Sequence, residues 1–366
     1  MARKCSTMLQ LGVSVPARRL VAQLRVMPLH AAPTAAQADW MSLNYGMFIH
    51  FGPWTFSGTG DGKFPAADVR APDLDARKWA RLAAESGMRY AVLTAKHVDG
   101  FCLWPSRHTP YSVAATPGKR DWVAEFVAAF RAEGLKVGLY YALLDRHCPF
   151  FEDDARYAAY VRDQVEELLT GYGDILELWF DGAWDKDHPT RDWPHDPAWP
   201  NDRGARWEWA RLYEHIHRLQ PRCLVIQNSS SDRPGEPNYL PVDVRTSEHY
   251  DFVWREQLCP PRLDPVFPTS ESEVEQKSAA AVEQKSAGAL YLPLEYCTTL
   301  TPGWFWQANA CYSHTSAATI AEWRTRAERQ RANLLLNVGP DTSGKLPDYH
   351  RPFLLEAERL VRTGRG

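Results

Sequence analysis

Residues 175–182 read ILELWFDG, a short and strongly apolar run that ends in the carboxylate of Asp181. Seven further runs rich in β-branched, aromatic and leucine residues follow residue 40, and they begin at Gly46, Tyr90, Leu135, Cys223, Val242, Ala289 and Ala332. Runs this apolar are typical of parallel strands that are buried on both faces. The sequence therefore predicts eight short strands that share one core.

Amphipathic, helix-like segments separate most of these runs. They begin at Ala76, Asp121, Ala155, Ala205 and Ser316, and most of them end in Gly or Pro. Strands and helices that alternate in this way favour a (β/α)8 barrel of the α/β class. A doubly wound open sheet is the alternative, but no GxGxxG motif follows the first run, which argues against a dinucleotide-binding version. The sixth run is the weakest strand prediction, because no clear helix precedes it.

One catalytic domain accounts for most of the chain, since barrels of this class commonly reach the length of 366 residues. We expect the barrel over residues 38–362, after an N-terminal extension of residues 1–37 and without a C-terminal β-sandwich. The extension lacks the continuous apolar stretch of a good signal peptide, so it predicts no compartment. Two insertions, residues 185–204 and the repeated VEQKSA at Val274 and Val282, are expected to be exposed.

Composition narrows the class of partner. The net charge of -3 and pI near 6.5 give no basic stripe for nucleic acid, and no apolar run reaches the roughly 20 residues of a membrane-spanning helix. The 15 Trp, 15 Tyr and 14 Phe residues supply flat apolar faces that suit sugar rings. The seven cysteines include no CxxC pair, so neither a zinc cluster nor a disulfide framework is indicated. We expect a soluble protein that binds a neutral glycan or another small molecule, with no nucleic acid and no membrane.

Catalytic groups of a barrel come from the carboxyl-terminal ends of its strands. The polar residues that close the apolar runs are His50, His97, Tyr140, Tyr141, Asp181, Asn228, Glu248, Glu295 and Asn337. A carboxylate at the end of a run as apolar as ILELWF is costly to leave without a partner, which favours a chemical role for Asp181. Glycoside hydrolysis needs two carboxyl groups, one ionised and one protonated. Asp181 with either Glu248 or Glu295 supplies such a pair.

Six segments of the chain carry a family resemblance. They read, in order, FIHFG (48–52), LTAKHVDGFCLWPSRHTPYSV (93–113), LWFDG (178–182), RTSEHY (245–250), LEYCTTLTPGWFW (294–306) and NLLLNVGPDTSGKLP (333–347). Together they resemble the α-L-fucosidases of glycoside hydrolase family 29. The resemblance implies a (β/α)8 barrel and a retaining, exo-acting α-L-fucosidase that hydrolyses terminal fucosyl linkages of oligosaccharides or glycoconjugates.

The resemblance also assigns roles to individual residues. Asp181 corresponds to the nucleophile of the LWFDG-like segment, and His50 and His97 correspond to histidines that bind fucose hydroxyls. A tyrosine that closes the third strand approaches the nucleophile in the family. This role falls on Tyr141, with Tyr140 as the alternative.

The proton donor and the remaining sugar contacts are less uniform in the family. RTSEHY points to Glu248 as the acid/base, whereas the segment similar to the α-1,3/1,4-specific branch points to Glu295 as the alternative. Glu295, Trp179 and Trp304 are expected to contact the substrate, with Trp304 as an apolar wall for the fucose methyl group. Val98 stands where the family usually has a second histidine, so one hydrogen bond to the sugar is missing or comes from elsewhere.

Three other functions compete with this interpretation. They are a barrel glycosidase of related specificity, such as one for α-galactosides, a catalytically impaired fucose-binding barrel, and a metal-dependent barrel hydrolase. An impaired barrel should lack one carboxylate, and here neither the nucleophile nor a donor candidate is missing. His97 and Asp99 are potential metal ligands, but barrel metallohydrolases require an HxH motif at the first strand, and this motif is absent. We expect no metal and no cofactor.

Overall fold

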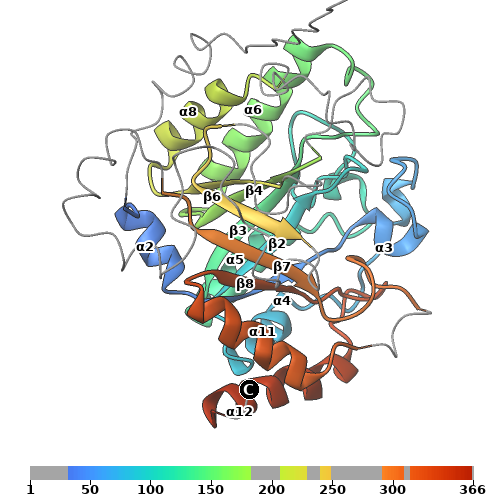
Figure 1. Ribbon diagram of the computed structural model, residues 1–366. Helices are drawn as coiled ribbons and strands as arrows, with labels where there is room; N and C mark the ends of the chain where they lie inside the picture. Colours follow the sequence, from blue (N-terminus) through green and yellow to red (C-terminus); the bar gives the residue numbers. More distant parts are fainter. Residues whose placement is uncertain (1–31, 183–206, 229–239, 249–290, 309–313, 365–366) are drawn as a thin grey trace, which may run out of the picture.

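The eight predicted runs form a closed parallel barrel in the computed structural model, which describes residues 32–182, 207–228, 240–248, 291–308 and 314–364 (Figure 1). Each strand pairs with the next in sequence, and the last closes onto the first. The strands are β1 (Tyr45–Ile49), β2 (Tyr90–Lys96), β3 (Lys136–Ala142), β4 (Glu177–Asp181), β5 (Leu224–Gln227), β6 (Val244–Glu248), β7 (Leu294–Thr299) and β8 (Asn333–Asn337). The predicted fold class is confirmed, and the open-sheet alternative is wrong.

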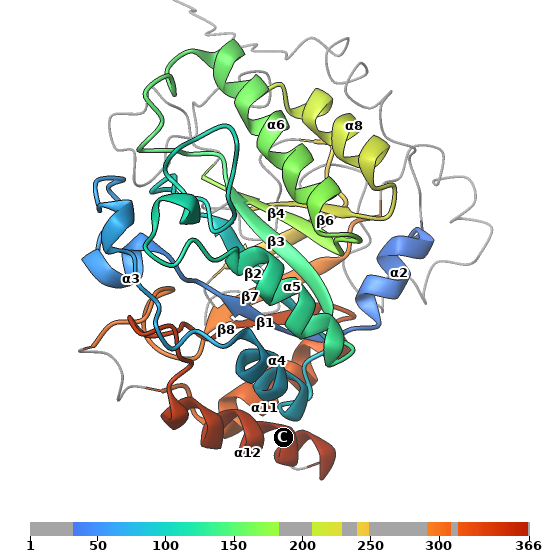
Figure 2. The same cartoon turned by 180° about the vertical axis from the view of Figure 1, so that it is seen from behind.

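Helices surround the barrel. The five predicted ones are α4 (Ala76–Glu85), α5 (Trp122–Ala132), α6 (Asp154–Gly171), α8 (Trp209–Leu219) and α11 (Ala317–Arg329). In Figure 1, α6 and α8 lie on one side of the barrel and α11 lies on the other, beside α12 (Arg351–Arg362); Figure 2 shows α4 and α5 in front. Side chains that accept backbone N–H bonds at the first turn fix the starts of four helices, and these caps are Asp75, Asp121, Asp153 and Ser316.

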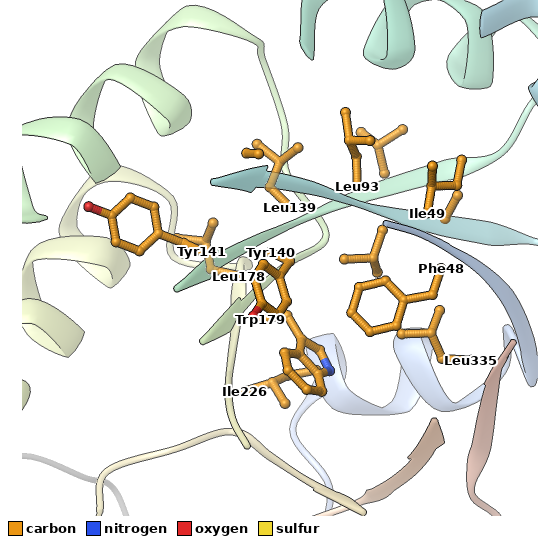
Figure 3. Close-up of a cluster of buried hydrophobic side chains, with 14 of the residues drawn as sticks. Phe48, Ile49, Leu93, Leu139, Tyr140, Tyr141, Leu178, Trp179, Ile226 and Leu335 are labelled. Atoms are coloured by element: carbon orange, nitrogen blue, oxygen red, sulfur yellow. The ribbon is translucent and has the colours of Figure 1, made fainter. Parts of the chain in front are cut away.

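Every residue of β1, β2, β4, β5 and β8 is buried. One face of each strand contacts the barrel interior and the other contacts the helices, which is why these runs are continuously apolar rather than alternating. Aromatic rings fill part of the interior, where Phe48, Tyr140 and Trp179 pack together with ring centroids 5.3–5.9 Å apart (Figure 3). The core therefore reaches up to the ends of the strands.

A helix that the sequence did not predict, α2 (Ala35–Met41), belongs to the barrel. Thr34 caps it, its Gln37 side chain donates to the carbonyl oxygen of Asp243 at 2.7 Å, and its Trp40 is completely buried. In Figure 1, α2 lies at the end of the barrel opposite the short helix α3 (Pro53–Ser57). The expected boundary between residues 37 and 38 therefore falls inside a packed helix.

Short helical turns complete the described chain, namely the 3-10 helices η1 (Ala66–Asp68), η2 (Val113–Ala115) and η3 (Asp348–His350). The sixth strand, the weakest prediction, pairs with β5 through two residues and with β7 through four. The two predicted insertions, residues 185–204 and the VEQKSA repeats, lie outside the described residues. Within the described part of the chain, no helix is long and apolar enough to cross a bilayer.

Candidate active site

Asp181 is the last residue of β4, at the carboxyl end of the barrel, and only 9% of its surface is exposed. The chain turns sharply directly after it, because Gly182 has a φ of +65°. A Cβ atom at position 182 would come within 2.9 Å of the Leu144 Cβ atom. Glycine at position 182 therefore allows the chain to leave the strand while Asp181 stays at the barrel end.

A buried amide joins Asp181 to Glu248, the last residue of β6. The Nδ2 atom of Asn228 donates to Asp181 Oδ1 at 3.2 Å and to Glu248 Oε1 at 2.9 Å. Two oxygens that share one nitrogen at these distances lie no more than about 6 Å apart. The structure therefore brings together the carboxylate pair that the sequence predicted, and it adds Asn228, to which the sequence gave no role.

The tyrosine beside Asp181 is Tyr140, whose hydroxyl donates to Asp181 Oδ2 at 2.7 Å. Tyr141 lies on the opposite face of β3, as Figure 3 shows. Its hydroxyl donates to Gln164 at 2.7 Å and accepts a hydrogen bond from Lys96 at 3.1 Å. The prediction that Tyr141 approaches Asp181 is therefore wrong, and the alternative, Tyr140, occupies that place.

Lys96 is the charged partner of Tyr141 on the face of β3 toward the helices. The Lys96 ammonium group is completely buried, forms a 2.9 Å ion pair with Asp145, and lies 4.4 Å from the centre of the Tyr141 ring. A register shift between Thr94 and Lys96 places Lys96 directly opposite Tyr141. A charge this deeply buried requires such partners, so Tyr141 stabilises the fold behind the site.

The two carboxyl groups of the site differ in their electrostatic environments. Burial and the neighbouring negative charge of Asp181 raise the pKa of Glu248 to about 8, although the hydrogen bond from Asn228 opposes this change. Each oxygen of Asp181 accepts a hydrogen bond, from Tyr140 and from Asn228, and such bonds favour an ionised carboxylate. The arrangement suits one ionised and one protonated group at neutral pH.

Glu295 lies deeper in the barrel than Glu248, the last residue of β6. It pairs in register with Thr246, two residues before the end of β6, and its side chain has no exposed surface. Its carboxyl oxygens accept hydrogen bonds from Trp179 Nε1 and from the Tyr90 hydroxyl, both at 2.8 Å. This position does not favour Glu295 as the acid/base or as a substrate contact, because both of its oxygens are bonded inside the core.

A second buried carboxyl group accompanies Glu295. Glu177 is completely buried and accepts a hydrogen bond from the indole N–H of Trp40. Burial, together with the charge of Glu295, raises the pKa of Glu177 well above its usual value, and burial raises the pKa of Glu295 to about 7. Trp179, held by Glu295, stacks on Tyr140 with ring centroids 5.4 Å apart. Trp179 and Glu295 therefore fix the position of the Tyr140 ring from inside the barrel. A contact between Trp179 and the sugar stays a prediction.

His50 follows β1 and is held by Asn337, the last residue of β8. The Asn337 amide donates to the Trp304 carbonyl at 2.7 Å, so its oxygen faces His50 Nδ1, also at 2.7 Å. Burial lowers the pKa of His50 to about 3, so the ring is neutral. Nδ1 therefore carries the hydrogen, which leaves Nε2 as an acceptor for a hydroxyl group. Asn337, one of the polar residues that close the apolar runs, therefore positions a predicted ligand-binding residue.

His97 follows β2 and lies among aromatic rings. Its ring stacks on Tyr140 at 5.3 Å and meets the edges of Trp54 and Phe305 at 5.3 and 4.9 Å. Burial lowers the pKa of His97 well below its usual value, so this histidine is also neutral. The Trp304 ring lies 5.0 Å from the ring of His50. The predicted residues His50, His97 and Trp304 are therefore brought together beside Tyr140, with Trp54 and Phe305 as aromatic neighbours that the sequence did not single out.

Val98, at the position where the family usually has histidine, is 3% exposed. Its Cγ2 atom would lie 3.1 Å from a Cβ atom at Gly60, so the valine packs against the Gly-rich loop after β1. Asp99 accepts a hydrogen bond from the backbone N–H of Phe101 at 2.9 Å. The described residues contain no group of three or more His, Cys, Asp or Glu side chains that could hold a metal ion.

A parallel eight-stranded barrel with two adjacent carboxyl groups, neutral histidines and aromatic rings at its strand ends has the architecture of a barrel glycoside hydrolase. Comparison with known proteins identifies the family within this class. The family model described as Alpha-L-fucosidase matches residues 66–362. The chain therefore belongs to the alpha-L-fucosidase family.

Individual relatives agree with this assignment. A protein of Oryza sativa subsp. japonica is 34% identical over 351 residues, which cover 92% of this chain and 60% of the rice protein. Alpha-L-fucosidase 1 of Arabidopsis thaliana is 29% identical over 92% of this chain and 61% of its own length. A solved glycoside hydrolase 29 family member from an unknown rumen bacterium has a TM-score of 0.71 at 28% identity, over 92% of this chain and 58% of that chain. The chain thus spans about three-fifths of the length of these relatives.

Proposed function

We propose that the chain is a retaining, exo-acting α-L-fucosidase that hydrolyses terminal α-L-fucosyl linkages of glycans. The observation that carries the proposal is the Asn228 amide, which bonds to Asp181 at 3.2 Å and to Glu248 at 2.9 Å. The bonded oxygens are therefore within about 6 Å of each other. Retaining glycosidases hold their two carboxyl groups about 5–5.5 Å apart, and inverting ones about 6.5–9.5 Å apart. The upper limit here supports the retaining mechanism.

The reaction takes place in two steps. Asp181 attacks the anomeric carbon, the bond to the leaving oxygen breaks, and Glu248 donates its proton to that oxygen. Glu248, now ionised, then takes a proton from water, and the water oxygen displaces Asp181 from the anomeric carbon. The two inversions at this carbon give net retention of configuration.

The electrostatics support this division of roles. Tyr140 and Asn228 donate hydrogen bonds to Asp181, which favour its ionised form and fix its orientation. A pKa of about 8 at Glu248 keeps this donor protonated at neutral pH. Ester formation at Asp181 removes its negative charge, which lowers the pKa of Glu248 when it must act as a base.

The neutral histidines fit a sugar rather than a charged ligand. His50 offers Nε2 as an acceptor because Asn337 holds its Nδ1–H, and His97 lies beside it with ring centroids 5.7 Å apart. We assign both to fucose hydroxyls, and Trp304 to the methyl group. Glu295 has no place in this set because its oxygens are bonded to Trp179 and Tyr90.

An aryl glycoside panel tests the proposal. The wild-type chain should hydrolyse 4-nitrophenyl α-L-fucoside in preference to the α-D-galactoside and β-D-fucoside, and proton NMR of the first product should show α-L-fucose. Asp181→Ala should lose nearly all turnover while its circular dichroism and thermal midpoint stay close to those of wild type. A preference for another glycoside, or β-L-fucose as the first product, would contradict the assigned specificity or mechanism.

A further inference from the structure

Hydrogen bonds on both sides of the Asn228 backbone fix the point from which its side chain extends. Its backbone N–H donates to the Phe180 carbonyl at 2.8 Å, and its backbone carbonyl oxygen accepts a hydrogen bond from Gln227 Nε2 at 2.5 Å. The residue is 2% exposed. The nitrogen of the side-chain amide lies between Asp181 and Glu248 and donates one hydrogen bond to each.

The chemistry of the amide limits where the Glu248 proton can be. Only the NH2 end of a carboxamide can donate to two carboxyl groups, with one hydrogen for each. Glu248 Oε1 is the oxygen that accepts from Asn228. In a protonated carboxyl group the carbonyl oxygen is a much better hydrogen-bond acceptor than the hydroxyl oxygen, so a proton on Oε1 would weaken the bond from Asn228. The acidic proton is therefore placed on Oε2.

We infer that Asn228 is a positioning residue that selects Oε2 of Glu248 as the proton-carrying oxygen and holds it at a fixed separation from Asp181. The inference rests on the proposed function, because it assigns a consequence to the direction of the Glu248 proton. General acid catalysis requires the proton to point at the leaving oxygen. A Glu248 that is free to carry its proton on either oxygen would be correctly oriented for part of the time only.

The groups that face Glu248 decide what loss of Asn228 does to its titration. Across the barrel end these are Asp181 on β4 and Tyr140 on β3, and on the adjoining strand β7 the Cys297 thiol. These groups are negative or neutral, so none of them lowers the pKa of Glu248, whereas the hydrogen bond from Asn228 does lower it. Removal of the amide therefore raises the pKa of Glu248 further.

The test compares Asn228→Ala, which removes both N–H donors, with Asn337→Ala, which removes another buried strand-end amide that contacts His50 instead of a carboxyl group. kcat/KM is measured for aryl α-L-fucosides with good and poor leaving groups. Asn228→Ala should lose about tenfold more on the poor leaving group than on the good one. Asn337→Ala should lose activity by similar factors on both substrates.

Asn228→Asp provides a second variant of nearly the same shape, in case the alanine variant folds poorly. An aspartate at position 228 that is ionised, or that donates its one O–H to Asp181, leaves Glu248 Oε1 without this donor, so the same leaving-group dependence is expected. Equal losses on both substrates in Asn228→Ala and Asn228→Asp would overturn the inference and reduce Asn228 to a structural residue.

A readout without turnover separates this inference from the proposed function. The Glu248 carboxyl carbon is titrated by 13C NMR in glutamate-labelled protein, with Glu248→Gln to assign the signal. The pKa should rise by about one pH unit in Asn228→Ala and stay unchanged in Asn337→Ala. An unchanged pKa in Asn228→Ala would contradict the inference even in an active fucosidase, whereas inactivity on fucosides with the expected rise would contradict only the proposed function.

Discussion

The two adjacent tyrosines of β3 provide a matched pair of variants. Tyr140→Phe removes a hydroxyl that donates to Asp181 at 2.7 Å, whereas Tyr141→Phe removes one that donates to Gln164 at 2.7 Å. Both side chains are buried. A hydrogen bond to a charged group contributes about 1.5–3 kcal/mol. Because 1.36 kcal/mol is tenfold in rate, Tyr140→Phe should lower kcat/KM about 10- to 150-fold.

The assay is steady-state hydrolysis of an aryl α-L-fucoside, with thermal unfolding of each variant measured in parallel. Tyr141→Phe should keep kcat/KM within about twofold of wild type, since its hydroxyl contacts no reacting group. It should nevertheless unfold at a lower temperature, because it leaves the buried Lys96 ammonium group with one acceptor fewer. Activity, and not stability, distinguishes the two variants.

A larger loss of kcat/KM in Tyr141→Phe than in Tyr140→Phe would refute the reasoning. It would mean that the face of β3 toward the helices, and not the barrel interior, contacts the reaction centre. Comparable small losses in both would show that the Tyr140 hydroxyl does not orient the nucleophile.

Three further predictions follow from the same geometry. With a pKa of about 8, Glu248 loses its proton as pH rises through that value, so kcat/KM for a poor leaving group should fall on the alkaline side; a rate that stays level up to pH 10 would exclude Glu248 as the acid. His50→Ala and His97→Ala should each lower kcat/KM by a factor of about ten or more, roughly 1.4 kcal/mol. Wild-type kcat/KM values in both variants would mean that the sugar does not bind beside these histidines. Glu295→Gln should lower the thermal midpoint with the same small loss of activity on good and poor leaving groups, whereas Glu248→Gln should affect poor leaving groups selectively; the reverse result would return the donor role to Glu295.

The fold was predictable because burial on both faces leaves a simple pattern in the sequence. Each of the eight apolar runs contains one strand, including the sixth, for which no preceding helix was evident. The helix α2 was missed because it lies in a segment interpreted as an extension, and its burial depends on distant contacts such as Gln37 with Asp243. No local pattern reports a contact across that many residues.

The same burial explains why the choice between Tyr140 and Tyr141 was wrong. Strand side chains alternate between two faces, but in β3 both faces are buried, so apolar character does not identify the face that lines the barrel. On the helix side of β3, Tyr141 bonds to the buried Lys96 ammonium group, which is paired with Asp145. This pairing becomes visible only in three dimensions.

Glu295 was assigned to the wrong end of its strand, because the apolar run begins several residues before the strand does. The apolar stretch from Ala289 suggested that Glu295 closes a strand, but β7 begins at Leu294 and continues to Thr299. Glu295 is therefore the second residue of the strand and lies in the barrel interior. Asn228 and Asn337 were noted as strand-end residues, but no catalytic role was predicted for them from the sequence. The role of an amide side chain depends on the groups that the fold places beside it, here Glu248 and His50.

The central claim, that Asp181 forms a covalent bond with fucose, is tested most directly by trapping the intermediate. The wild-type chain is incubated with 2-deoxy-2-fluoro-α-L-fucosyl fluoride, whose fluorine at C2 slows both steps while the fluoride leaving group favours the first. Mass spectrometry of the intact chain and of its peptides should show one fluorofucosyl group, attached to Asp181. A label on another residue, or turnover with inversion and no label, would contradict the account.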